Sequence, residues 1–232
     1  MTNTSITISD KFKFYISGAK MQASLSRGTF LAFEGCDRSG KTTQVERLVE
    51  KLNKEGKLTK WIKFPMRTTT IGKVIHSFLT GETELEDHAV HLLFSANRWE
   101  MEKDIMATLE SGVNVIVDRY AYSGVAYSAA KPGLSLSWCR QSDSGLPRPD
   151  LVCFLQITEA VASQRPDYGG ERYETTDFQN KVITNFSSMK HSGWCEIMAD
   201  RSMDEVERDI YEKVLTEITK KNKGEVQKLW TK

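Results

Sequence analysis

Residues 34–44, "EGCDRSGKTTQ", decide the fold that we predict for this chain. Residues 35–42 match the phosphate-binding pattern G-x-x-x-x-G-K-[S/T]. An apolar run precedes this stretch, and apolar residues spaced as on one helix face follow it, which is the strand–loop–helix context that the pattern requires. In such a loop, glycines let backbone N–H groups converge on phosphate oxygens at a helix N-terminus. The sequence therefore predicts a nucleotide-binding α/β domain.

The loop supplies the residues that we expect to bind ATP: Gly35, Cys36, Asp37, Arg38, Ser39, Gly40, Lys41, Thr42 and Thr43. Lys41 is expected to bridge the β and γ phosphates, and Thr42 to ligate Mg²⁺. Asp118 ends a later apolar strand and is the second candidate for the Mg²⁺ shell. The stretch "NKEG" (53–56) lacks the aspartate of a guanine signature and follows no apolar strand, which disfavours a regulatory GTPase.

Apolar runs and helical spacing alternate along the rest of the chain. The predicted strands are residues 29–34, 58–64, 113–118, 151–157 and 194–199. The predicted helices are residues 45–52, 71–79, one long helix over 85–109, and 203–220. Strands separated by helices, without hairpin signals, indicate a parallel sheet covered on both faces. We therefore expect a three-layer α/β P-loop fold with a five-stranded parallel sheet, in one domain over residues 28–232.

Composition limits the kind of ligand. The chain has 232 residues and a formal net charge of +1, so phosphate recognition should be local, and a small nucleotide suits it better than a nucleic acid. The four cysteines are scattered and form no C-x-x-C pair, which indicates reduced thiols and no zinc site. No apolar run approaches the roughly 20 residues that a membrane span needs.

Residues 1–27 differ from the rest of the chain. They are rich in Ser and Thr, with Asp10 as the one acid, which is typical of a mitochondrial presequence. A single arginine at the end of the segment weakens that interpretation. The alternative is a disordered leader, with Met21 as a second start.

The segments between the loop and Asp118 supply candidates for a second pocket. Arg67 follows a predicted strand end, where ligands of open α/β sheets gather. Phe94 and Arg98 lie four residues apart and share one helix face, so a ring can stack on a base while a guanidinium donates to it. Arg119 stands beside Asp118. Taken alone, Phe94 is more typical of a core residue and Arg98 of a solvated charge.

Residues 27–230 closely resemble the eukaryotic thymidylate kinase family. The resemblance rests on six motifs in the family's order: "FEGCDRSGKTTQ", "FPMRTTTIGK", "EDHAVHLLFSANRWE", "VDRYAYSGVAYSAAK", "SGLPRPDLVCFLQ" and "ERYE". It implies a Mg²⁺-dependent kinase that converts ATP and dTMP into ADP and dTDP. It also implies a homodimer, formed through helices packed face to face, with no nucleic-acid or membrane partner.

The resemblance also implies residue roles. Asp37 would bond the 3′-hydroxyl of dTMP, and Arg38 would contact the transferred phosphoryl group; Arg67 and Arg119 would hold the dTMP phosphate. Phe94 would stack on thymine, Arg98 would bond its O4, and Tyr127 would crowd the sugar 2′ position. Phe64, Ser123 and Tyr173 complete the predicted dTMP site. The predicted catalytic residues are Asp37, Arg38, Lys41 and Arg119.

Residues 158–172 match the family's mobile lid, and Gly169 and Gly170 suit such a segment. Arg165 in this segment would lie by the ATP base. Location is expected in the cytoplasm, with the nucleus as a second site and the presequence as the mitochondrial alternative. Two other functions stay open at this point: a kinase of another nucleoside monophosphate or of a deoxynucleoside, and a nucleotide-binding regulator without turnover.

Overall fold

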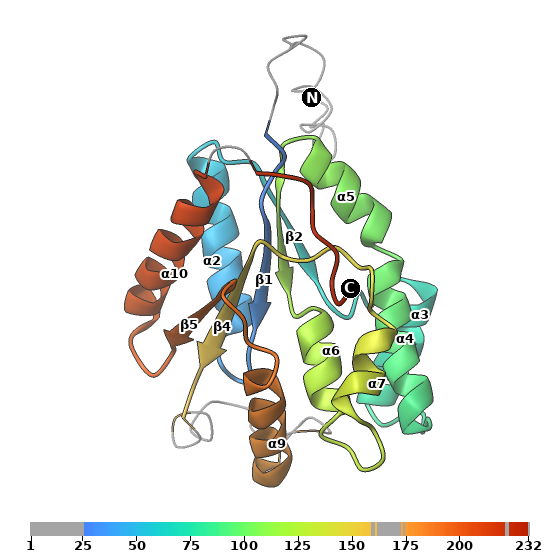
Figure 1. Cartoon of the computed structure of the whole chain (residues 1–232). Helices are drawn as coiled ribbons and strands as arrows, with labels where there is room; N and C mark the ends of the chain where they lie inside the picture. Colours follow the sequence, from blue (N-terminus) through green and yellow to red (C-terminus); the bar gives the residue numbers. More distant parts are fainter. Residues whose placement is uncertain (1–25, 159–160, 162–172, 174, 221–222, 232) are drawn as a thin grey trace, which may run out of the picture.

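The computed structural model of the chain describes residues 26–158, 161, 173, 175–220 and 223–231. The sheet has five parallel strands in the order β2-β3-β1-β4-β5 (Figure 1). The strands are β1 (Phe30–Glu34), β2 (Thr59–Lys63), β3 (Asn114–Asp118), β4 (Leu151–Gln156) and β5 (Trp194–Met198). The predicted parallel sheet is confirmed.

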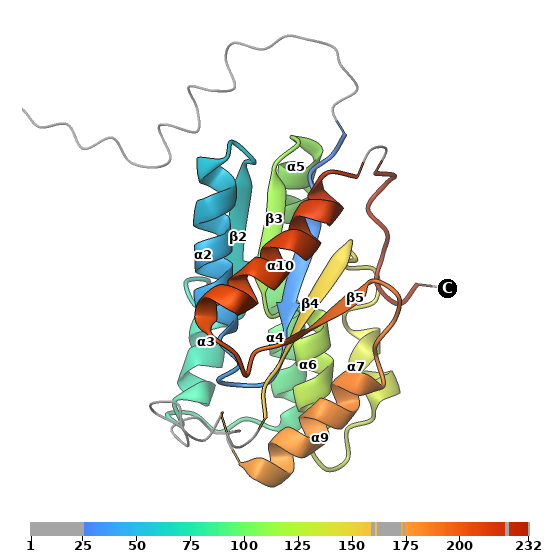
Figure 2. The ribbon, with the colours of Figure 1, turned by 90° about the vertical axis from the view of Figure 1, so that its left-hand side faces the viewer.

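Helices cover both faces of this sheet. They are α2 (Lys41–Lys54), α3 (Thr70–Leu79), α4 (Asp87–Trp99), α5 (Glu102–Glu110), α6 (Ala121–Ser128), α7 (Leu136–Gln141), α9 (Thr176–Ser187) and α10 (Met203–Ile218). Helices α2 and α10 pack on one face, whereas α5, α6 and α9 pack on the other (Figure 2). Side chains alternate between these two cores along β4, where Phe154 faces α9 and Leu155 faces α2 and α10. The three-layer P-loop architecture follows.

The predicted long helix over residues 85–109 is wrong, because the chain breaks into α4 and α5 at Glu100 and Met101. The Met101 N–H bonds the carbonyl of Arg98, three residues back, which tightens the turn. The Glu100 carboxylate accepts bonds from Thr69 (2.8 Å) and Asn97 (3.0 Å) at this point. The apolar spacing hides the break, since Met101, Ile105 and Leu109 keep the helical repeat across it.

Helices α6, α7 and α9 were not expected from the sequence. In α6, "AYSGVAYS", six of the eight residues are buried, so no polar face alternates with the apolar one. A helix that is buried on most sides lacks the amphipathic signal on which the prediction depends. This omission matters for the site, because α6 carries several of its residues.

Strand β1 lies at the centre of the sheet, and the strand order reverses around it. In an open parallel sheet, ligands bind outside the carboxyl ends of the strands at such a switch point. Glu34 ends β1 and Asp118 ends the neighbouring β3, so both lie at this edge. The loop after β1 then enters α2 directly.

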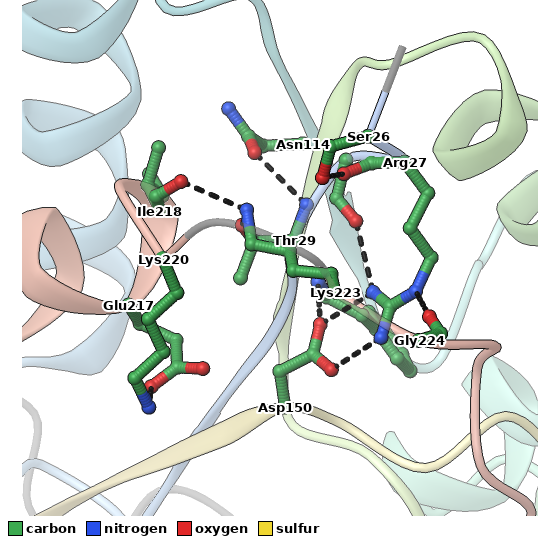
Figure 3. A network of polar contacts seen from close by, with 12 residues as sticks. Ser26, Arg27, Thr29, Asn114, Asp150, Glu217, Ile218, Lys220, Lys223 and Gly224 are labelled. Atoms are coloured by element: carbon green, nitrogen blue, oxygen red, sulfur yellow. Dashed lines mark hydrogen bonds and ion pairs between the residues drawn. The ribbon is translucent and has the colours of Figure 1, made fainter. Parts of the chain in front are cut away.

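A separate polar network lies at the opposite edge of the sheet, where the strands begin (Figure 3). Arg27 donates to both carboxylate oxygens of Asp150 (2.7 and 2.8 Å) and to the carbonyl of Gly224 (2.7 Å). Lys223 donates to the hydroxyl of Thr29 (2.6 Å) and to the carbonyl of Ile218 (2.8 Å). These contacts join the entry into β1 to the segment after α10. In the part of the chain that the structure describes, no helix is long and apolar enough to cross a membrane.

Candidate active site

A cavity of about 1040 Å³ opens at the carboxyl edge of the sheet. It brings together most of the residues that the sequence predicted for the site: Asp37, Arg38, Gly40, Lys41, Thr42, Thr43, Phe64, Arg67, Phe94, Arg98, Asp118, Arg119, Ser123, Tyr127 and Tyr173. Gly35, Cys36 and Ser39 belong to the same loop but do not line the cavity. Arg165 and nearly all of the predicted lid lie outside the described residues.

The loop between β1 and α2 is shaped to hold an anion. Gly40 precedes α2 in the left-handed region (φ 84°), and no side chain caps the helix. No acidic residue occupies the first turn, so the free N–H groups and the helix dipole favour a phosphate there. Gly35 (φ 143°) cannot carry a side chain, since a Cβ would lie 2.4 Å from the carbonyl oxygen of Leu155.

Lys41 lies inside this loop and is almost fully buried. Its ammonium donates to the carbonyl of Cys36 (2.5 Å) and to the hydroxyl of Ser39 (3.1 Å). Burial and the neighbouring charge of Arg119 lower the pKa of Lys41 to about 8. Burial also raises the pKa of the Cys36 thiol to about 11, so this cysteine is a poor nucleophile at neutral pH.

Thr42 and Asp118 meet at the start of α2 and the end of β3. The Thr42 hydroxyl donates to Asp118 Oδ2 (2.6 Å), so two hard oxygen donors from different elements face the same place. Lys63, at the end of β2, donates to the Thr42 hydroxyl (3.2 Å). The sequence analysis missed Lys63, although its position at a strand end beside the predicted pocket was a usable signal.

Asp37 is the centre of a hydrogen-bond network that joins the loop to α6 and α9. Its carboxylate accepts from Arg119, from the hydroxyl of Tyr127 (2.8 Å) and from Gln179 Nε2 (3.1 Å). Burial alone would raise the pKa of Asp37, but the charges of Arg119 and Lys41 outweigh burial and hold it below the usual value. The carboxylate is therefore ionised and its position is fixed. Gln179 had no sequence signal, since α9 was not predicted.

Two arginines of the site have backbones in the left-handed region, Arg38 (φ 61°) and Arg119 (φ 63°). This region costs a non-glycine residue about 1–3 kcal/mol and is concentrated at functional sites. Burial alone would lower the pKa of Arg119, but Tyr127, Asp37 and Asp118 raise it, so its charge is permanent. Both arginines line the cavity.

Glu34 received no role from the sequence, although it begins the stretch that decides the fold. It is fully buried at the end of β1 and accepts from the N–H groups of Tyr120 (3.0 Å) and Ser123 (3.2 Å). It also accepts the hydroxyl of Ser123. These N–H groups belong to the start of α6, where the side chain of the N-cap residue Tyr120 makes no capping bond. Glu34, on strand β1, takes the place of that cap. The sequence did contain a signal for this role, which is an acidic residue at the end of an otherwise apolar strand. A buried acid of this kind needs hydrogen-bond partners.

The far wall of the cavity comes from the segment after β2 and from α4. Phe94 is half-buried and lines the cavity without belonging to either hydrophobic core, which disfavours the interpretation as a core residue. Arg98 is buried and forms an ion pair with Asp143 (2.6 Å), so it is not a solvated charge. Phe64 packs at 5.8 Å against Tyr120, and Arg67 lies 3.2 Å from His76 Nδ1. The predicted base and phosphate residues therefore share one wall.

Tyr173 closes the cavity near α9. Its ring stacks on Phe178 (5.1 Å between centroids) and contacts Tyr127 edge-on (6.2 Å). Its carbonyl accepts a bond from Gln179 (2.8 Å), the residue that also holds Asp37. The aromatic cluster thus extends from α6 to the segment in front of α9.

A phosphate loop at a helix N-terminus, a strand-end aspartate, and an arginine-lined pocket on the same edge define a P-loop kinase of the nucleoside monophosphate kinase class. The thymidylate kinase family model matches residues 33–210. The chain is 47% identical to thymidylate kinase of Danio rerio over 210 residues, which are 89% of this chain and 99% of that protein. It is 45% identical to thymidylate kinase of Homo sapiens, over 87% of this chain and 98% of that protein.

A solved structure of thymidylate kinase from Candida albicans superposes with a TM-score of 0.79 and 36% identity, covering 88% of this chain and 98% of that one. The chain belongs to the thymidylate kinase family, the phosphotransferases that make dTDP from dTMP and ATP for dTTP synthesis. This assignment selects the dTMP kinase among the functions that the sequence left open.

Proposed function

We propose that the cavity side chains Arg67, Phe94, Arg98 and Arg119 bind dTMP, with Asp37 and Tyr127 against its sugar. The observation that carries the proposal is the shared cavity, which these side chains line together with Gly40, Lys41 and Thr42 of the phosphate loop. Two arginines suit a phosphate dianion, and an aromatic ring beside a guanidinium suits a base with carbonyl oxygens. Phe64, Ser123 and Tyr173 complete this dTMP site.

We assign ATP to the loop from Gly35 to Thr43, with Lys41 on the β and γ phosphates. Thr42 and Asp118 fit Mg²⁺, since their oxygens already meet at 2.6 Å and this ion takes one or two protein ligands beside water and phosphate oxygens. Among the described residues, no cluster of three His, Cys, Asp or Glu side chains offers an alternative metal site. When bound, Mg²⁺ neutralises charge on the phosphates.

The chain's own task is positioning and charge compensation. The acceptor is a phosphate oxygen that is already ionised, so no general base is needed. Asp37 and Arg119 hold each other in place, and Arg119 presents a permanent charge to the acceptor phosphate. Arg38 is assigned to the phosphoryl group in transfer, where a cation acts on charge that is greatest in the transition state.

The variant Arg38→Ala tests this assignment. We expect kcat to fall by roughly 10³-fold or more, as for arginine fingers, while the KM for dTMP changes by less than about threefold. Arg47→Ala is the control, because Arg47 pairs with Asp204 and Glu207 on the exposed side of α2. A loss confined to the KM would assign Arg38 to ground-state binding and contradict its catalytic role.

We further propose a homodimer in which α3 and α4 meet their copies. These helices pack side by side and expose Val74, Leu92 and Trp99, each by 40% or more (Figure 1). Exposed apolar side chains grouped on neighbouring helices are typical of an association surface.

We propose residues 158–172 as the lid and Arg165 as a contact to the ATP base.

For the whole chain we propose a single catalytic domain over residues 28–232, preceded by an extension over residues 1–27 whose last residue, Arg27, is bonded to that domain. We propose a cytoplasmic location, with the nucleus as a second site and mitochondrial targeting by residues 1–27 as the alternative. Fractionation combined with N-terminal sequencing of the native protein would decide between them.

A further inference from the structure

We propose that Asp143 and Gly124 are positioning residues that fix Arg98 as a hydrogen-bond donor, and that this fixation selects 4-oxo over 4-amino pyrimidine nucleotides. The inference rests on the proposed contact between Arg98 and the substrate base. It adds two residues that the reaction itself does not require.

Asp143 holds the guanidinium through two parallel bonds. Arg98 Nε donates to Oδ1 (3.0 Å) and Nη2 donates to Oδ2 (2.6 Å), and the two side chains are 3% and 0% exposed. The Ser95 hydroxyl donates to Oδ1 as well (2.8 Å). No hydrogen bond joins Nη1 to another residue of the described part of the chain. Arg98 lines the cavity, and both N–H groups of Nη1 are left to donate to a substrate there.

The segment that carries Asp143 is itself fixed against α4. Trp99 Nε1 donates to the Ser142 carbonyl (2.8 Å), and His91 Nε2 lies 2.9 Å from the Ser142 hydroxyl. The segment near the C-terminus holds the other side, where the Gly145 N–H donates to the Leu229 carbonyl (2.9 Å). Asp143 therefore cannot move with Arg98 if a ligand displaces the guanidinium.

Gly124 limits the guanidinium from α6. A Cβ built on Gly124 would lie 2.6 Å from Nη2, 2.8 Å from Nη1 and 2.9 Å from Cζ of Arg98. Any side chain at this position would push the guanidinium out of its place. The group is thus confined between a carboxylate and a backbone that has no side chain.

Confinement matters because a guanidinium only donates hydrogen bonds. The 4-carbonyl of thymine or uracil can accept from Nη1, whereas the 4-amino group of cytosine is itself a donor. A mobile arginine could turn away from cytosine. A fixed arginine instead keeps its N–H donor directed at the 4-amino group, which is also a donor, so no hydrogen bond can form. Sites built in this way reject the wrong analogue strongly, because buried polar groups are left unpaired.

The test compares kcat/KM for dTMP, dUMP and dCMP in Asp143→Asn and Gly124→Ala. We expect the dTMP:dCMP ratio to fall by about tenfold or more in both variants, while the dTMP:dUMP ratio stays constant because both bases carry the 4-carbonyl. Asp150→Asn is the matched control, since Asp150 also accepts two bonds from one guanidinium, that of Arg27, at the opposite edge of the sheet (Figure 3). It should leave both ratios unchanged.

Equal losses for all three nucleotides, or an unchanged dTMP:dCMP ratio, would overturn the inference. Arg98→Met separates it from the proposed function on which it rests. If Arg98→Met leaves the ratio unchanged, the base contact of Arg98 is wrong. If it lowers the ratio but Gly124→Ala and Asp143→Asn do not, only the positioning role is wrong. Should Asp143→Asn fail to fold, Gly124→Ala and Ser95→Ala test the same confinement with the Asp143 carboxylate kept.

Discussion

Lys41 is buried and Asp37 is half-buried in the same loop, yet the pKa values of the two groups respond differently to their surroundings. Lys41 has partners that accept its protons, but burial and Arg119 dominate and lower its pKa to about 8. Asp37 keeps its charge because Arg119 and Lys41 outweigh burial and lower its pKa. The loop therefore strongly favours the charged form of Asp37 but only weakly favours the charged form of Lys41. A phosphate anion would restore the charge of Lys41.

This difference predicts the pH dependence of ATP binding. The free protein loses the Lys41 proton as the pH rises through about 8, whereas the phosphates of ATP favour the charged lysine. Affinity for ATP should therefore weaken above pH 8, by about tenfold at pH 9, and binding at pH 8.5 should take up a proton. Calorimetry in two buffers of different ionisation enthalpy measures that uptake. Lys41→Arg, which stays charged, should show neither effect, and a pH-independent wild type would contradict the assignment.

At the scale of elements, two asparagines bind the start of β2 and the segment after it in the same way. Asn97 on α4 binds the N–H (2.7 Å) and the carbonyl (3.2 Å) of Met66, next to Arg67. Asn53 on α2 binds the N–H (2.9 Å) and the carbonyl (3.0 Å) of Thr59, at the start of the strand. The first asparagine orients a segment of the cavity wall, whereas the second lies away from the cavity.

Asn97→Ala should therefore raise the KM for dTMP by about tenfold with little change in kcat, and reduce stability by about 1–3 kcal/mol, because buried partners lose their bonds. Asn53→Ala removes the matching pair of backbone bonds at an exposed site, without the further bonds of Asn97 to Thr69 and Glu100, and should leave the KM unchanged. Steady-state kinetics and chemical denaturation of both variants provide the comparison. A similar rise in KM for Asn53→Ala would show that Asn97 acts through general stability alone.

The elements also show where sequence reasoning succeeds. The strands and α2 were predictable, because apolar runs and a motif with strict context mark them. The break between α4 and α5 was not, since tertiary bonds to Glu100 produce it while the apolar spacing continues. Arg67, beside a predicted strand, and Arg98, on a predicted helix, were singled out from the sequence, and both line the cavity. The residues that position the site, Asn97, Asp143 and Gln179, were not predicted. Such a residue is recognised only by its hydrogen-bond partner, which is far away in the sequence and becomes a neighbour only in the folded protein.

At the scale of the whole molecule, the pair between Arg27 and Asp150 joins the entry into β1 to the start of β4 and to the segment after α10. The two side chains are only 14% and 17% exposed, so solvent screens the pair weakly. Asp150 also accepts the Phe30 N–H (2.8 Å), which connects the pair to β1. The network closes the edge of the sheet that is remote from the active site.

Arg27→Ala should therefore lower the free energy of unfolding by about 2 kcal/mol with kcat unchanged. Removal of residues 1–25 alone should change neither quantity, as expected for an extension outside the catalytic domain. Arg201→Ala, which breaks an exposed arginine–aspartate pair, should cost no more than about 1 kcal/mol. Thermal and chemical denaturation of Arg27→Ala, Arg201→Ala and the shortened chain measure these changes in stability. An unaltered stability of Arg27→Ala would contradict the role of this network.

The position of β1 has a consequence for synthesis of the protein. Both of its neighbours come much later in the chain, since β3 begins 80 residues after β1 ends and β4 begins at residue 151. At about 5–20 residues per second, a ribosome needs roughly 4–16 s to deliver the first partner. All five residues of β1 are fully buried in the finished fold. We therefore expect nascent chains to expose this apolar segment for seconds and to depend there on ribosome-associated chaperones.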